Sequence, residues 1–142
     1  MRVAFALILL IIISVSCESD DNALVESLNG TYSGIFYRTS PETKYSVSEV
    51  TIAFNRSDYI GSSSEIKYPA ICYGTYELTG NNIEFFDQCI WTAEFDWSLI
   101  LSGKFNIEKE GDYIVIKRSY NNSIIDTYKL KKTDSAGYFT TD

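Results

Sequence analysis

The sequence predicts an all-β fold, an eight-stranded antiparallel up-and-down β-barrel preceded by a short helical turn. Short segments in which apolar and polar residues alternate follow one another from residue 30 onward, a period typical of half-buried strands. Many are joined by Gly and Asn residues, which tolerate the backbone of tight hairpin turns. No helical pattern interrupts them after residue 28. Sequential hairpins favour an up-and-down order over a Greek key, and eight strands suffice to close a barrel.

The segment before the barrel has helical spacing, whereas the first three strands have a period of two. Leu24, Val25 and Leu28 share one helical face, so we expect a short helical turn that ends at Asn29-Gly30. Strands are expected over 31–38, 45–54 and 57–63, with a break between the first two at residues 40–42. Their predicted inward residues are Tyr32, Gly34, Phe36, Val50, Ile52, Phe54, Tyr59 and Gly61.

The other five strands are expected over 71–79, 83–86, 98–107, 113–120 and 123–131. Residues 80–82, 110–112 and 121–122 have the composition of turns, and a longer loop precedes the strand at 98–107. The predicted inward residues are Cys72, Gly74, Tyr76, Leu78, Leu99, Leu101, Gly103, Phe105, Ile114, Ile116, Ile124, Tyr128 and Leu130. The barrel is therefore expected to span 29–132, and 133–142 to form a loose C-terminal tail.

The N-terminus has the order of a secretory signal. Arg2 supplies a positive charge, an apolar run extends from Val3 to Ile13, and small residues lead to Cys17. A spanning helix needs about 20 apolar residues, more than this run contains. The cysteine resembles that of a bacterial lipobox, and the acidic patch after it resembles the export signal of surface lipoproteins in Bacteroidota-like bacteria. We therefore expect a signal peptide at 1–16 and a tether at 17–28 with Cys17 lipidated; the alternative is an ordinary signal peptide with an incidental cysteine.

The other two cysteines, Cys72 and Cys89, form an even pair in a chain expected to be exported. Exported proteins meet an oxidising compartment, so we predict a disulfide, with two separate buried thiols as the alternative. The expected location is the cell envelope, where the lipid would hold the protein at the outer membrane, facing either the periplasm or the surface.

Composition excludes some functions and disfavours others. The 12 basic and 19 acidic residues give a formal net charge of −7, which repels the phosphates of nucleic acid. The chain has no histidine, the commonest general base and a common zinc ligand. We therefore expect neither an enzyme nor a bound metal or cofactor.

The start of the first strand resembles a family motif. In Leu28-Asn29-Gly30-Thr31-Tyr32-Ser33-Gly34, Gly30 and Tyr32 are similar to the Gly-x-Trp opening of lipocalins, with Tyr in place of Trp. As a whole, 28–132 resembles the lipocalin-like (calycin-type) domains of bacterial exported lipoproteins. The resemblance implies that the Tyr32 ring plugs the closed end of the barrel beneath a cation, for which Arg118 is the nearest candidate and Lys131 a substitute.

Aromatic residues are the candidate ligand-binding side chains. The chain has 11 tyrosines, 8 phenylalanines and 2 tryptophans, and both tryptophans lie in the loop before residue 98. Aromatic rings can line a cavity and tyrosine hydroxyls can orient a ligand, although the same residues can simply form the core. The predicted ligand-binding residues are Tyr32, Phe36, Phe54, Tyr76, Trp91, Trp97 and Phe105.

The acidic residues around the tryptophans allow two weaker hypotheses. Asp87, Glu94 and Asp96 offer the oxygen ligands that calcium prefers, but their spacing matches no known calcium loop. Glu94 and Asp96 are too close in sequence to straddle a glycosidic bond as acid and base. Separately, residues 134–136, Asp-Ser-Ala, resemble a short O-glycosylation motif of Bacteroidota-like exported proteins.

Two functions follow from this reasoning. The first is an envelope-anchored lipoprotein that binds a small hydrophobic or amphipathic ligand inside the barrel. The second is a non-enzymatic structural or interaction lipoprotein with a filled barrel that presents its loops to an envelope protein. The state of the barrel interior distinguishes them, since an open cavity favours the first and a packed one the second.

Overall fold

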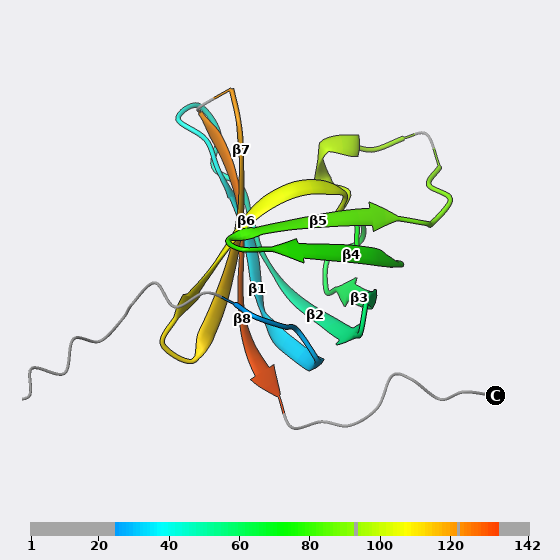
Figure 1. Cartoon of the computed structure of the whole chain (residues 1–142). Helices are drawn as coiled ribbons and strands as arrows, with labels where there is room; N and C mark the ends of the chain where they lie inside the picture. Colours follow the sequence, from blue (N-terminus) through cyan, green and yellow to red (C-terminus); the bar gives the residue numbers. More distant parts are fainter. Residues whose placement is uncertain (1–24, 93, 122, 134–142) are drawn as a thin grey trace, which may run out of the picture.

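The computed structural model describes residues 25–92, 94–121 and 123–133, and these form a closed antiparallel barrel (Figure 1). Each strand pairs with its neighbours in the chain, and the last strand closes on the first. The predicted eight-stranded up-and-down architecture is therefore confirmed. The strands are β1 Gly30–Thr39, β2 Val47–Asn55, β3 Asp58–Ser63, β4 Tyr73–Thr79, β5 Asn82–Asp87, β6 Gly103–Glu110, β7 Tyr113–Tyr120 and β8 Ile124–Thr133.

The seam between β1 and β8 closes the barrel. The pairing runs from Thr31 opposite Thr133 to Thr39 opposite Ile125, along nearly all of both strands. Gly34 lies within this seam, where a Cβ atom would overlap the backbone carbonyl oxygen of Lys129. Glycine at this position therefore lets the two strands approach closely where the barrel closes.

The two ends of the barrel differ in their connections. Residues 40–46, 64–72, 88–102 and 121–123 leave the strands at one end, which we call the loop end. Residues 56–57, 80–81 and 111–112 form short turns at the other, which we call the turn end. The chain enters the barrel from Val25 at the turn end, and β8 ends there at Thr133 (Figure 1).

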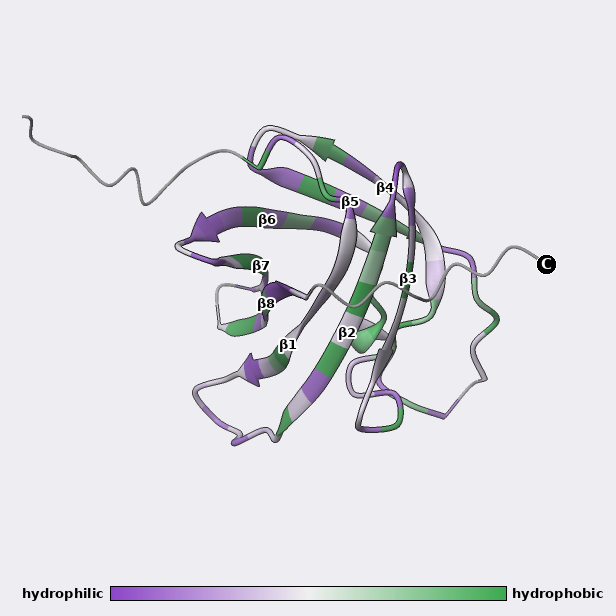
Figure 2. Ribbon diagram, turned by 90° about the horizontal axis from the view of Figure 1, so that it is seen from below, coloured by the Kyte–Doolittle hydropathy of each residue, from purple (hydrophilic) through white to green (hydrophobic). Residues whose placement is uncertain are grey.

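The core fills the barrel with inward-facing residues from all eight strands. Alternation along β2 is visible as hydrophobic and hydrophilic bands in Figure 2. Phe85 lies at the centre of an aromatic cluster. Its ring centroid is 5.1 Å from that of Tyr59, 5.6 Å from that of Phe105 and 6.4 Å from those of Phe54 and Tyr76.

Two predicted elements are wrong in part. Residues 25–29 contain no helix, so the described part of the expected helical turn is absent, while residues 23–24 lie outside the described residues. The strand expected over 98–107 begins only at Gly103, because Trp97–Leu99 form a 3₁₀ turn and residues 100–102 cross the loop end. This turn also contradicts the prediction that no helical segment follows residue 28. Gly103 has a φ of +85°, which redirects the chain into β6.

The remaining boundaries shift by a few residues. Thr133 belongs to β8 rather than to a tail, and residues 134–142, with the Asp-Ser-Ala motif, lie outside the described residues. Cys72 precedes β4 and lies in the loop over 64–72 rather than on the inward face of a strand. Among the described residues, no helix is long and apolar enough to cross a membrane.

The cation near Tyr32 is not the one implied by the lipocalin resemblance. Lys132 Nζ lies 6.0 Å from the centroid of the Tyr32 ring at the turn end. Arg118 lies at the loop end instead, with its guanidinium carbon 4.2 Å from the centroid of Phe105. Lys131 pairs with Asp112 at 2.9 Å. Lys132 follows Leu130 by two positions and so faces inward, whereas Lys131 faces outward.

The aromatic core gives a stability prediction with an adjacent control. Phe85→Ala should lower the free energy of unfolding by about 3–5 kcal/mol, because it removes a buried ring and leaves a cavity. Phe86→Ala, one position along β5 and exposed, should cost less than about 1 kcal/mol. Chemical denaturation followed by circular dichroism measures both, and equal losses would contradict the inward orientation of Phe85.

Candidate functional site

A buried ion pair lies on the inward face of the barrel at the loop end. Arg38 of β1 is paired in register with Asp126 of β8, and their side chains are only 2% and 1% exposed. Arg38 donates from Nε to Oδ1 at 2.6 Å and from Nη2 to Oδ2 at 2.9 Å. Burial alone would lower the pKa of Arg38, but the hydrogen bonds and negative charge of Asp126 and Asp96 raise it above its usual value. The guanidinium is therefore a permanent charge in a fixed, bidentate orientation.

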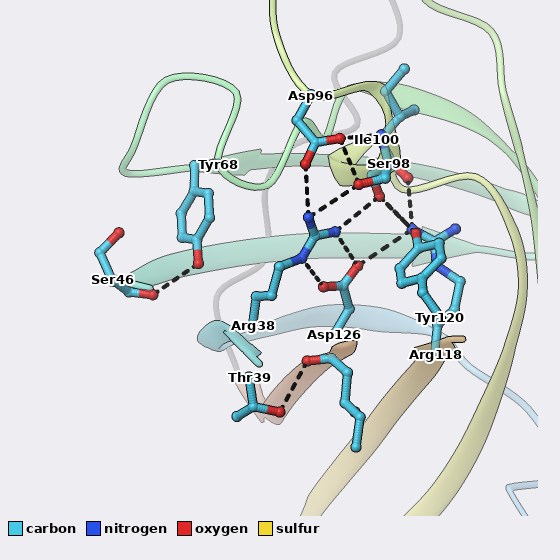
Figure 3. A network of polar contacts seen from close by, with 11 residues as sticks. Arg38, Thr39, Ser46, Tyr68, Asp96, Ser98, Ile100, Arg118, Tyr120 and Asp126 are labelled. Atoms are coloured by element: carbon cyan, nitrogen blue, oxygen red, sulfur yellow. Dashed lines mark hydrogen bonds and ion pairs between the residues drawn. The ribbon is translucent and has the colours of Figure 1, made fainter. Parts of the chain in front are cut away.

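Arg38 also holds the loop over 88–102 across the loop end (Figure 3). Its Nη1 donates to Asp96 Oδ2 at 2.9 Å and to the Ser98 hydroxyl at 3.1 Å. Asp96 in turn caps the 3₁₀ turn, since its Oδ1 accepts from the Ser98 amide at 2.9 Å and from its hydroxyl at 2.6 Å. One guanidinium thus bridges a strand carboxylate and a loop carboxylate.

Arg118 and Tyr120, both from β7, bind backbone carbonyls of the same loop. Arg118 donates from Nη1 to the carbonyl of Ser102 at 2.5 Å and from Nη2 to that of Ser98 at 2.8 Å. The Tyr120 hydroxyl donates to the Ser98 carbonyl at 2.8 Å. The Arg118 guanidinium also lies over the rings of Phe105 and Tyr120, at 4.2 and 4.6 Å. Carbonyls that would otherwise lack partners above the core are thereby satisfied.

The loop over 64–72 is tied to the loop over 88–102. Cys72 and Cys89 form a disulfide with an S–S distance of 1.98 Å, so the predicted pairing is confirmed. Lys67 Nζ donates to the Thr92 hydroxyl at 2.9 Å and lies 4.8 Å from the centroid of the Phe95 ring. The two longest loops of the loop end therefore form one connected surface.

This connected surface exposes hydrophobic side chains. Phe95 stacks on Trp97 with ring centroids 5.9 Å apart, and Trp91 lies 5.7 Å from Phe95; we call these three residues the loop-end aromatic cluster. Trp97 is 56% exposed, and Ile90 and Ile66, on the same two tied loops, are 97% and 92% exposed. Large exposed apolar side chains on loops that are tied together form a candidate interaction surface.

The structure divides the seven predicted ligand-binding residues into two groups. Trp91 and Trp97 lie on the loop, outside the barrel. The other five are buried in the core, where their rings contact one another or neighbouring rings, as in the Phe54–Tyr76 pair at 5.0 Å and the Phe36–Tyr128 pair at 4.8 Å. These five are Tyr32, Phe36, Phe54, Tyr76 and Phe105.

The three carboxylates of the calcium hypothesis have separate partners. Asp87 accepts a hydrogen bond from Trp91 Nε1 at 2.6 Å, and burial raises its pKa although that hydrogen bond opposes the rise. Asp96 pairs with Arg38, and Glu94 is exposed. Among the described residues, no group of three or more His, Cys, Asp or Glu side chains is placed to hold a metal ion.

Sequence reasoning missed Arg38 and Asp126, although a signal was present. Arg38 continues the inward series of Tyr32, Gly34 and Phe36, and Asp126 occupies an inward position two residues before Tyr128. Opposite charges at inward positions of the first and last strands indicate a buried pair once the barrel is assumed to close.

Removing the charge of Asp126 tests the buried pair. Asp126→Asn should lower the free energy of unfolding by about 3–5 kcal/mol, because it leaves Arg38 buried without its bidentate partner. Asp112→Asn, which breaks the exposed pair with Lys131, is the matched control and should leave stability almost unchanged. Denaturant titration of the two variants measures the difference, and a stable Asp126→Asn protein would contradict the proposed importance of the pair.

The stability that Asp96 contributes through Arg38 and Ser98 should depend on pH. Burial would raise the pKa of Asp96, but hydrogen bonds from Ser98 and the charge of Arg38 lower it below 3.8. The ionised carboxylate therefore stabilises the folded state above pH 3.8, and this contribution is lost as the pH falls through the lower, folded-state pKa. The difference in free energy of unfolding between wild type and Asp96→Asn should thus shrink below pH 3.8 in denaturation experiments. An equal difference at pH 3 and pH 7 would disprove a stabilising role of the ionised Asp96 carboxylate.

The loop end combines buried ion pairs with an exposed aromatic cluster. A scan against protein-family models, a search of curated proteins and a search of solved structures found no match to this chain. Barrels of this architecture host many unrelated functions, so the role of the loop end has to follow from its own side chains.

Proposed function

We propose that this chain is a non-enzymatic, lipid-anchored interaction protein of the cell envelope. Its barrel is a packed scaffold that presents the loops over 64–72 and 88–102 to an envelope protein. The observation that carries the proposal is the contrast between a core filled by aromatic rings and a loop surface on which Ile66, Ile90 and Trp97 are exposed.

The packed interior favours this function over ligand binding inside the barrel. Five of the predicted ligand-binding residues contact other core side chains, and the Arg38 network crosses the mouth through which a ligand would enter. An apolar ligand would have to displace both the rings and the ion pairs. The carboxylate of Asp96 is likewise bound to Arg38, which makes it a poor candidate for acid–base chemistry.

Export and anchoring are supported by the sequence and by the disulfide. Cys17 lies outside the described residues, but Cys72–Cys89 is the kind of bond that persists in an oxidising compartment. The chain enters the barrel at the turn end, opposite the loop-end aromatic cluster. A lipid on Cys17 would therefore hold the turn end toward the membrane and leave the cluster facing away from it.

Photocross-linking in cells tests the proposal. A photoreactive benzoylphenylalanine at Trp97 or Ile90 of the full chain should yield a discrete adduct with an envelope protein after irradiation. The same residue at Tyr113, exposed at the turn end, is the control and should not yield that adduct. The absence of adducts at both loop positions would refute the interaction function.

The anchor is tested separately by labelling cells with palmitate. The wild-type chain should incorporate the label, and Cys17→Ser should not. Uptake of label by Cys17→Ser would disprove lipidation at this residue, while leaving the photocross-linking result to stand on its own.

A further inference from the structure

A cavity at the turn end lies apart from the loop-end surface. It has a volume of about 490 Å³, is open to solvent, and is lined by the segment at residues 25–27, the hairpin between β6 and β7, and the end of β8. Val25, Tyr32 and Ile114 supply its apolar lining, while Lys109 and Lys132 line it from β6 and β8. Its volume is within the range of sites for small ligands, although its lining is more polar than is usual for them.

The charged side chains around this cavity are Lys109, Lys132, Glu26 and Asp112, and with Lys131, which pairs with Asp112, the cations outnumber the carboxylates by three to two. Neither Lys109 nor Lys132 has a carboxylate oxygen within 4.0 Å of its Nζ among residues 25–92, 94–121 and 123–133. Two carboxylates, Glu26 and Asp112, also line the cavity, but Asp112 is already paired with Lys131 at 2.9 Å. On a chain with a net charge of −7, this is a place suited to an anion.

The place of the cavity at the turn end relates it to the expected lipid anchor. Val25 follows Cys17 by eight positions, and a fully extended chain of that length spans at most about 28 Å. A lipid on Cys17 would therefore keep Val25, at the edge of the cavity, within about 28 Å of the membrane surface. Because the lining pairs ammonium groups with apolar side chains, it complements a phosphate headgroup and the adjoining glycerol and acyl carbons.

We infer that this cavity binds the headgroup of an anionic phospholipid from the membrane in which the protein is anchored. The inference rests on the lipid anchor of the proposed function. It gives the protein a second membrane contact, in which Lys109 and Lys132 bind the phosphate while Tyr32 and Ile114 contact the apolar part of the lipid. The barrel would then be oriented on the membrane rather than held only by a tether.

Native mass spectrometry of the full chain in non-ionic detergent tests the inference. Dihexanoyl phosphatidylglycerol should form a one-lipid adduct, whereas dihexanoyl phosphatidylcholine should bind much more weakly. Lys109→Glu with Lys132→Glu should weaken the adduct by at least about 25-fold, because each lysine contributes about fivefold in affinity for an anionic lipid. Lys44→Glu with Lys104→Glu changes the net charge equally, away from the cavity, and should preserve the adduct. Circular dichroism checks that both variants fold.

Three results would overturn the inference. Equal binding of phosphatidylglycerol by the Lys109/Lys132 variant would place the lipid elsewhere, and equal competition by inorganic phosphate would make the cavity a phosphate site. Binding that appears only after Glu18, Asp20 and Asp21 are changed to Ser would show that the acidic tether occupies the cavity. None of these results depends on photocross-linking at Trp97, so failure here and failure of the interaction function are distinguishable.

Discussion

The buried ion pair between Arg38 and Asp126 is the constraint on which the loop end depends, because it joins the two strands that close the barrel. A buried pair adds little net stability over a well-packed apolar pair, but each charge alone is costly to bury. Slipping β8 by one residue against β1 would turn Asp126 outward and leave Arg38 unpaired inside. The pair therefore favours one register of the closing seam, and that register positions the loop-end network.

The same guanidinium couples the closed seam to the surface. Arg38 reaches Asp96 and Ser98, and Arg118 and Tyr120 add hydrogen bonds to the carbonyl of Ser98 (Figure 3). Arg118 also donates to the carbonyl of Ser102. A segment with no regular strand thus follows a definite path over the core. The two ends of the barrel consequently differ in chemistry. The loop end carries the Arg38 network and the loop-end aromatic cluster. The turn end has short turns and a cavity whose lining includes Lys109 and Lys132.

Sequence patterns predicted the strands well because strand formation leaves a local signal. Alternation around Val50, Ile52 and Phe54 identifies an inward face without any knowledge of the strand's partners. The partnership of Arg38 with Asp126 connects residues 88 positions apart, so it becomes visible only after closure and register are known. The path of residues 98–102 was mispredicted as strand because Leu99 and Leu101 alternate. Among the described residues, the backbone there pairs only with Ala70, in an isolated bridge, and Arg118 binds the carbonyls of Ser98, Ile100 and Ser102. Of the seven predicted ligand-binding residues, the two tryptophans lie on the loop over 88–102, and the other five belong to the core cluster.

The double attachment of the loop over 88–102 has a consequence for binding. Cys89 is bonded covalently to Cys72, and Asp96 is paired with Arg38. The loop-end aromatic cluster therefore belongs to a short segment that is attached at two points. Ordering a free loop on association costs conformational entropy, which subtracts from affinity. A segment that is already attached at two points avoids much of this cost. Even a modest contact area around Trp97 can therefore give useful affinity. Substitutions at Cys89 or Asp96, the two points of attachment, can alter binding without contacting the partner.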